Sequence, residues 1–179
     1  MAKSVATHKR FQTQAAAVQR EITQENTPHS ELVQSLQRQV ANSFVLYANY
    51  KHYHWQTFGP LFRDLHLLFD ELAKSVLETI DEFAERIRMI GQDPISSPQE
   101  VIEQATVQVS QPGLTVREMI EEGKNNLAVV IKDMRDGARA AEEANDPGTV
   151  DLFSRNVQPH EKYEWWLRDI LEKGDGLTS

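Results

Sequence analysis

One stretch of the sequence, residues 50–86, contains two pairs of side chains whose types and spacing could bind a metal ion. His66 and Asp70 are four residues apart, and so are Asp81 and Glu85. On a helix, the members of each pair would lie one turn apart on the same face. Two carboxylates at this spacing repel each other, at a cost of about a few tenths of a kcal/mol. The pattern indicates either a solvated helix face, with His66 as an ordinary polar residue, or a site for a cation.

The distance along the helix limits the kind of metal site that these residues form. At about 1.5 Å per residue, Asp70 and Asp81 lie about 16 Å apart, whereas metal–ligand bonds are only about 2.0–2.2 Å long. One ion therefore cannot be held by both pairs of the same helix. An antiparallel copy, related by a two-fold axis near residues 75–76, would bring the first pair of one chain against the second pair of the other. The spacing predicts two equivalent intersubunit sites, for which iron, zinc and manganese are comparable candidates.

The other residues of this stretch predict a helix over residues 61–90 with two further faces. Its apolar residues share a face that we expect to be buried within the chain's own fold: Phe62, Phe69, Leu72, Val76, Ile80, Phe83, Ile87 and Ile90. The opposite face is solvated, and Glu82 and Arg86 are expected to form a surface ion pair there. Leu77 lies among the candidate ligands instead of on the core face, which indicates a second contact surface.

Helical periodicity dominates the whole chain, and no alternating run of β-branched residues predicts a sheet. Long helices are expected over residues 30–57, 61–90, 115–144 and 146–174. The connection over residues 91–114 is long enough to run along a bundle, and it includes a short helix at residues 98–104. The predicted fold class is all-α: a ferritin-like four-helix bundle with a long crossover between the second and third helices.

Local signals mark several helix ends. Ser30 is the expected N-cap of the first helix. Thr115 and Glu118 form a capping box at the start of the third, and Asp146 with Pro147 marks the start of the fourth. The first helix has an apolar side that we expect to face the core, formed by Leu32, Leu36, Val40, Phe44 and Tyr47.

The composition is that of a globular protein with a single domain of 179 residues, 40% of them hydrophobic and 26% charged. No apolar run is long enough to span a membrane, and the N-terminus lacks the apolar segment of a secretory signal. The absence of cysteine excludes disulfides and thiolate ligands. We expect a cytoplasmic protein, with association to the nucleoid as the alternative.

The chain divides into three expected regions. Residues 1–28 are predicted to be a mobile arm, residues 29–174 the bundle, and residues 175–179 a short tail. The formal charge of −8 argues against tight nucleic-acid binding by the folded body. The arm has four basic and two acidic residues, a net charge of only +2.

The spacing of five residues resembles the signature of the Dps family, miniferritins first described as DNA-binding proteins from starved cells. His54 is followed directly by Trp55, and the four residues described above come twelve, sixteen, twenty-seven and thirty-one positions after His54. The resemblance extends over about residues 30–173 and includes the "HEKYEWWLRDILE" of the last helix. Some cyanobacterial members use further histidines around the centre, so His52 and His160 are additional candidates.

The resemblance implies a hollow dodecamer that oxidises Fe(II), preferably with hydrogen peroxide over oxygen, and stores ferric mineral inside. Each intersubunit centre would hold two irons, with zinc as a competitor. Asp81 and Glu85 would come from one subunit, and His54, His66 and Asp70 from its two-fold mate. In this assignment Glu85 bridges the two irons, Asp81 completes the tighter position and Asp70 binds weakly.

Further residues follow from the same resemblance. Trp55 corresponds to a tryptophan thought to intercept radicals, and Lys51 to a position near the centre. Four acidic residues fall where the family has pores for iron entry: Glu142, Glu143, Asp146 and Asp151. Their alternative interpretation is helix capping and first-turn charge.

Three other functions compete with this interpretation. A ferritin or bacterioferritin would need E-x-x-H pairs, and no histidine here has a glutamate three residues before it. A nucleoid-compacting DNA-binding protein with little ferroxidase activity is the main alternative, although the arm is poorly basic and DNA binding is expected to be weak or absent. A zinc- or manganese-binding module on the same cage is the third.

Overall fold

The structure, a computed structural model, describes residues 12–17 and 27–172. Residues 12–17 are helical. The expected arm over residues 1–28 therefore lies largely outside the described residues, and the expected tail over residues 175–179 lies entirely outside them. None of the described helices is both long enough and apolar enough to cross a membrane.

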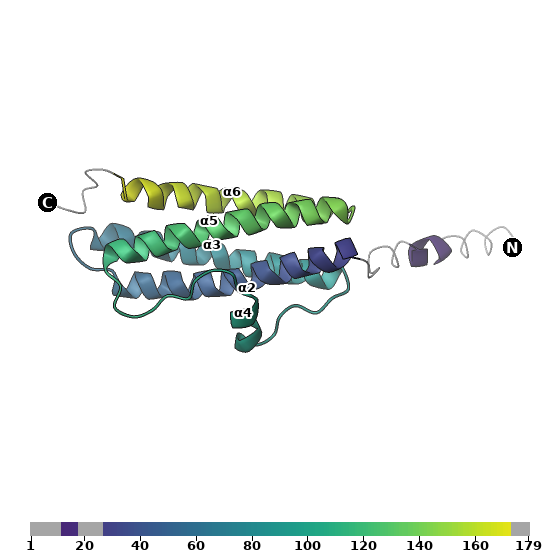
Figure 1. The fold of residues 1–179 in the computed structure, drawn as a ribbon, viewed down its shortest axis with the longest axis horizontal. Coiled ribbons are helices and arrows are strands. Elements are labelled where there is room, and N and C mark those ends of the chain that lie inside the picture. Colours follow the sequence, from purple (N-terminus) through teal and green to yellow (C-terminus); the bar gives the residue numbers. More distant parts are fainter. Residues whose placement is uncertain (1–11, 18–26, 173–179) are drawn as a thin grey trace, which may run out of the picture.

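Four long helices and one short helix form the described body, which contains no strand. They are α2 (Thr27–Gln56), α3 (Phe62–Met89), α4 (Pro98–Gln104), α5 (Val116–Glu143) and α6 (Pro147–Ile170). Helix α2 packs against α3 and α5, and α6 packs mainly against α5. Figure 1 shows α2 and α3 as one layer, α5 and α6 as the other, and α4 outside the bundle against α2. The predicted all-α bundle of four long helices, with a long crossover between the second and the third, is confirmed for the described residues.

Most predicted helix ends are confirmed, because their signals are local. Thr115 and Glu118 form the capping box of α5, and the Asp146 side chain accepts a hydrogen bond from the Thr149 amide at the start of α6. The prediction of Ser30 as an N-cap is wrong, since α2 already begins at Thr27. Pro28, the second residue of α2, is tolerated in the first turn because the N–H that proline lacks would have no helical partner there. Helix α6 ends at Ile170 and not near Gly174.

The long connection between α3 and α5 is held in place by asparagine side chains. Their hydrogen bonds to the backbone take the place of those that a helix or sheet would supply. The Asn49 side chain donates to the Gln108 carbonyl at 2.7 Å and accepts from the Ser110 amide at 2.9 Å. From α5, Asn126 bonds both the amide and the carbonyl of Gln108. The Asn42 amide oxygen accepts from the Thr106 amide at 2.8 Å. Backbone groups without a helical partner are thereby satisfied along the crossover.

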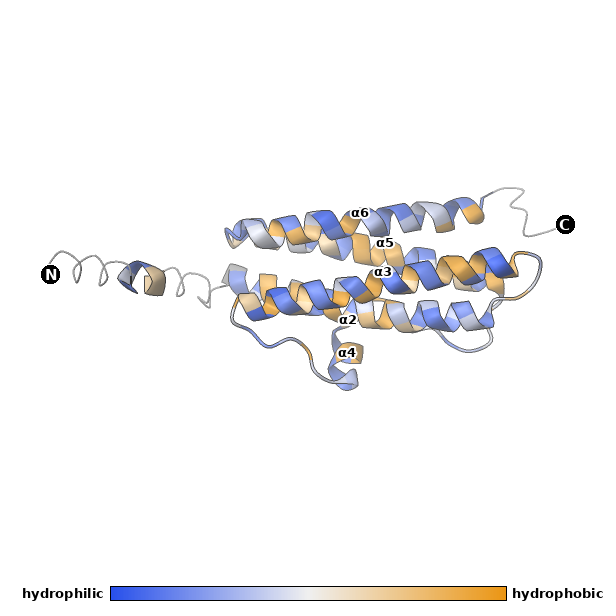
Figure 2. Cartoon of the chain, turned by 180° about the vertical axis from the view of Figure 1, so that it is seen from behind, coloured by the Kyte–Doolittle hydropathy of each residue, from blue (hydrophilic) through white to orange (hydrophobic). Residues whose placement is uncertain are grey.

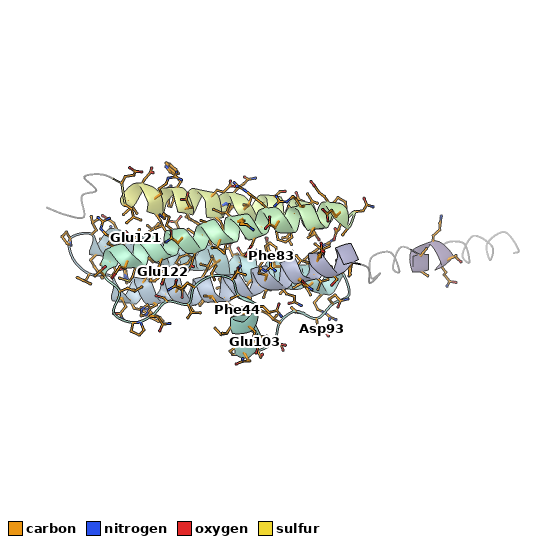
Figure 3. The ribbon with its side chains drawn as sticks, in the orientation of Figure 1. Phe44, Phe83, Asp93, Glu103, Glu121 and Glu122 are labelled. Carbon is orange, nitrogen blue, oxygen red and sulfur yellow. The ribbon has the colours of Figure 1, made fainter. Side chains whose placement is uncertain are left out.

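The core lies between the two layers, and Figure 2 shows polar and apolar residues alternating along each long helix. Phe69, Phe83 and Phe153 are fully buried there, and Figure 3 shows Phe83 between the layers. Two expected core residues are exposed: Phe44 is 41% and Phe62 is 46% exposed. Helical periodicity gives the apolar side of a helix, but it does not say whether the same chain covers that side.

Two glycines bring α5 close to its neighbours. At Gly137, a Cβ atom would lie within 2.6 Å of Cε1 of the Phe153 ring. At Gly123, a Cβ atom would lie 3.2 Å from a methyl group of Leu167 and at ordinary contact distance from the Tyr50 and Tyr53 rings. An aromatic ring therefore packs directly on the α5 backbone at Gly137, whereas a flexible methyl group lies over Gly123.

Candidate metal centre

Two candidate ligands, His54 and His66, come together where α2 and α3 run antiparallel. Their rings stack with centroids 3.6 Å apart. The Nδ1 of His54 lies 2.7 Å from the His66 carbonyl oxygen, and the Nδ1 of His66 lies 2.9 Å from the His54 carbonyl oxygen. A carbonyl oxygen only accepts hydrogen bonds, so each Nδ1 is the donor. In the neutral form, each Nε2 then keeps a lone pair for a metal ion.

Asp70, one turn after His66, is held by two lysines. The Lys51 ammonium lies 2.9 Å from Oδ1, and the Lys74 ammonium lies 2.7 Å from Oδ2. The hydrogen bonds from Lys74 and Lys51 hold the pKa of Asp70 well below its usual range, and Asp70 raises the pKa of Lys74 in return. Lys51 also lies 5.9 Å from the centroid of the exposed Trp55 ring.

Asp81 and Glu85 lie further along α3, on its exposed surface. Neither makes an ion pair or hydrogen bond with another described residue, unlike the neighbouring Glu82, which accepts from Arg155 and Asn156. The structure does not bring this pair to His54 and His66. Among the described residues, no three histidines or carboxylates gather into a group that could hold a metal ion. One chain therefore supplies two separate sets of donors whose chemistry suits a divalent cation.

Large apolar side chains are exposed around both sets of donors. Phe62 stacks against His66 with centroids 5.0 Å apart. The apolar residues concerned, each close to half exposed or more, are Trp55, Phe58, Phe62, Leu67 and Leu77. A concentration of exposed apolar residues of this kind is typical of a contact surface.

A second exposed apolar region lies between α2 and α4, which the sequence analysis did not identify. It is a cleft of about 400 Å³ whose lining includes Phe44, Val45, Val101, Ile102 and Val109. Figure 3 shows Phe44 on the side of α2 that faces α4. The exposure of Phe44, expected in the core, is explained by this cleft.

The remaining histidines do not join the candidate ligands. His160 is 1% exposed, and its Nδ1 donates to the Asn156 carbonyl at 2.8 Å, as expected for a buried, hydrogen-bonded histidine. Burial lowers the pKa of His160, although the bond to Asn156 opposes this shift. His52 is half-buried beside the Tyr53 ring and belongs to no metal-binding group of the described residues.

The four acidic residues considered for a pore differ in their surroundings. Asp146 is half-buried, and besides capping α6 it pairs with Arg86 at 2.6 Å. The prediction that Arg86 pairs with Glu82 is therefore wrong, because the guanidinium reaches across to α6. Asp151 lies 3.4 Å from Arg155. Glu142 and Glu143 are exposed in the last turn of α5.

The contact between Lys74 and Asp70 was missed by the sequence analysis, although the signal was available. Lys74 lies four residues after Asp70, the spacing at which opposite charges pair on a helix. The contact from Lys51 depends on how α2 pairs with α3, and no local pattern gives that register.

Comparisons with known proteins show which family this chain resembles in sequence and fold. A model of the ferritin-like domain matches residues 33–177. The "DNA protection during starvation protein 1" of Deinococcus radiodurans is 36% identical, over 79% of this chain and 69% of that protein. "General stress protein 20U" of Bacillus subtilis is 31% identical, over 79% of this chain and 97% of that protein.

Solved structures give the same picture. The X-ray structure of Dps from Thermosynechococcus elongatus matches with a TM-score of 0.82 and 48% identity, covering 86% of this chain and 98% of that one. Dps from Vibrio cholerae O1, described as a member of a broad superfamily of ferritin-like diiron-carboxylate proteins, matches with a TM-score of 0.77 and 29% identity. The match covers 82% of this chain and 92% of that one.

Proposed function

Because this chain belongs to the Dps family of ferritin-like proteins, we propose that it oxidises Fe(II) and stores the ferric product in a dodecameric cage in the cytoplasm. Hydrogen peroxide is the preferred oxidant in this proposal. The observation that carries it is the division of donors between the two ends of the α2–α3 pair. Two histidines with Nε2 lone pairs lie at one end, and two carboxylates without partners among the described residues lie at the other.

A two-fold pairing of subunits through α3 would complete the centre. With the axis near the middle of the helix, Asp81 and Glu85 of one subunit would meet His54, His66 and Asp70 of the other. The exposed apolar residues around both sets of donors support this pairing, because a partner subunit would cover them. The α2–α4 cleft offers further apolar surface for contact.

The donor types suit two Fe(II) ions as substrates. Glu85 would bridge the two irons, Asp81 would complete the tighter position and the histidines would supply neutral nitrogen ligands. Each Fe(II) gives up one electron, so two irons supply the two electrons that break the O–O bond of one hydrogen peroxide. Protons from the solvent convert the products to water, and zinc would compete for the same donors.

In this proposal DNA is protected by removal of iron and peroxide, and not by tight binding. Twelve chains of formal charge −8 would give a cage of about −96, and phosphate contacts require cationic groups. Gel-shift assays at about 50 and 200 mM salt discriminate the two modes, because tight binding at both would favour DNA compaction instead.

The direct test is anaerobic loading with Fe(II) followed by hydrogen peroxide. We expect two irons to be oxidised per peroxide, and the ferric iron to remain soluble and co-elute with a large assembly. The control is the variant with both Asp81→Asn and Glu85→Gln, which should assemble but oxidise iron slowly. Oxidation at the protein-free rate with a ferric precipitate would contradict the proposal for the wild-type protein.

A further inference from the structure

Among the five proposed ligands, Asp70 alone is occupied on both of its oxygens. Lys51 lies 2.9 Å from Oδ1 and Lys74 lies 2.7 Å from Oδ2. By contrast, Asp81 and Glu85 have no ion pair among the described residues, and the two histidines use only Nδ1. The centre therefore contains four available donors and one that is already bound to cationic groups.

The two lysines differ in how firmly the structure holds them. Lys51 comes from α2, its side chain is 22% exposed, and it packs near the Trp55 ring. Lys74 comes from α3, one turn after Asp70, and its side chain is 75% exposed. The Lys74 bond links two residues of one helix, so breaking it disturbs no contact between helices, whereas the Lys51 bond joins α2 to α3. Lys74 is thus the partner that leaves Asp70 more easily.

Charge makes the pair of lysines unfavourable for a second cation. One carboxylate with two ammonium groups carries a local charge of +1, so an approaching Fe(II) meets repulsion instead of attraction. Because the ammonium groups occupy different oxygens, the departure of Lys74 alone would open Oδ2 while Lys51 still oriented the carboxylate through Oδ1.

We propose that Lys74 is a positioning residue that sets the affinity of the second iron position by holding Asp70. This inference rests on the proposed function. In wild-type protein, the first iron binds the free carboxylates and a histidine, and the second iron binds only by displacing the Lys74 ammonium from Asp70. Lys74, which is not itself a ligand, would thereby make the second iron position weaker than the first.

The test is calorimetric titration of the assembled full-length protein with Fe(II) under anaerobic conditions. For Lys74→Gln we expect the second binding step to tighten by about two- to fivefold, the range that surface ion pairs give, with the first step unchanged. Lys74→Arg keeps the charge and should retain the weak second step. The matched control is Lys132→Gln on α5, since Lys132 has a similar exposure of 74% and pairs with Asp136 at the same distance of 2.7 Å. This control should leave both steps unchanged.

The outcomes separate this inference from the proposed function. If wild-type protein binds Fe(II) in two steps and Lys74→Gln leaves the second step unchanged, the role of Lys74 is wrong and the ferroxidase proposal stands. If Lys74→Arg tightens the second step as much as Lys74→Gln does, the positive charge of Lys74 is not what weakens the second iron position, and the inference is wrong. If wild-type protein binds no Fe(II), both proposals fail.

Discussion

Two histidine environments in this protein show how burial decides the use of a side chain. His54 and His160 each donate from Nδ1 to a backbone carbonyl, so both have the tautomer that leaves Nε2 with a lone pair. His54 is half-buried and stacks on a second histidine, whereas His160 is 1% exposed inside the bundle. The same hydrogen bond therefore leaves Nε2 available on a candidate ligand in one place and holds a neutral core residue in the other.

The buried histidine predicts a pH dependence of stability. Burial lowers the pKa of His160 in the folded protein, and the ordinary value is 6.5. Below this value the unfolded chain binds a proton that the folded chain does not, so the free energy of unfolding falls as the pH drops from 6.5 toward the lowered pKa. Denaturant unfolding of wild-type protein and His160→Gln at about pH 7.5 and about pH 5.5 should show the smaller decrease in the variant. An equal decrease in both would contradict a neutral, buried His160.

At the scale of helices, the contact between α5 and α6 depends on the absence of one side chain. A Cβ atom at Gly137 would enter the Phe153 ring, whose neighbours are core residues. The Gly123 position is a natural comparison, because it lies on the same helix and a Cβ atom there meets only a movable Leu167 methyl group. Both substitutions by alanine gain about the same helix propensity, near 1 kcal/mol.

We therefore expect opposite results for two alanine substitutions. Gly137→Ala should lower the free energy of unfolding by about 1–3 kcal/mol, because the core must shift to admit the extra atom. Gly123→Ala should be neutral or stabilising. Chemical denaturation of both variants measures the difference, and a Gly137→Ala variant as stable as Gly123→Ala would show that the ring moves aside without cost.

The sequence was most informative about features whose cause is local. The capping box at Thr115, the N-cap Asp146 followed by proline, and the short helix within the crossover depend on neighbouring residues, and the structure contains all three. The start of α2 was misplaced because two start signals, at Thr27 and Ser30, lie within one turn. The end of α6 was misplaced because neither glycine nor proline marks the residues next to Ile170.

Features that join distant parts of the chain could not be predicted in the same way. Arg86 has an acidic residue four positions before it, yet it pairs with Asp146, sixty residues later. Phe44 and Phe62 have the periodicity of core residues, but none of the segments that the structure describes covers them fully. For the candidate centre, spacing predicted that one helix carries two sets of donors, whereas the stacking of His54 on His66 required the register of α2 against α3.

At the scale of the whole molecule, the proposed division of ligands between two subunits predicts complementation between defective subunits. One variant carries Asp81→Asn with Glu85→Gln, and the other carries replacements of His54 and His66 by alanine. Each alone should form cages with little ferroxidase activity. When both are unfolded, mixed and reassembled, about a quarter of the centres should combine two intact halves if subunits pair at random. Activity well above that of either parent would support the intersubunit assignment.

The control for mixing is assembly itself. Differently tagged subunits should co-purify in one cage, which establishes that the variants pair with each other. If they co-purify and activity does not return, the ligands do not divide between two subunits as proposed.

The amide contacts along the crossover also affect the order in which the chain folds. The α2–α3 and α5–α6 pairs are joined within themselves by short turns, so each forms contacts between residues that are close in sequence. The hydrogen bonds between the crossover and Asn42 or Asn49 link residues about sixty positions apart. Forming such distant contacts costs more conformational entropy of the chain than forming local ones. We expect two local hairpins to form first and the crossover to lock last, so the α2–α4 cleft would be the final part of the subunit to take shape before it meets a partner.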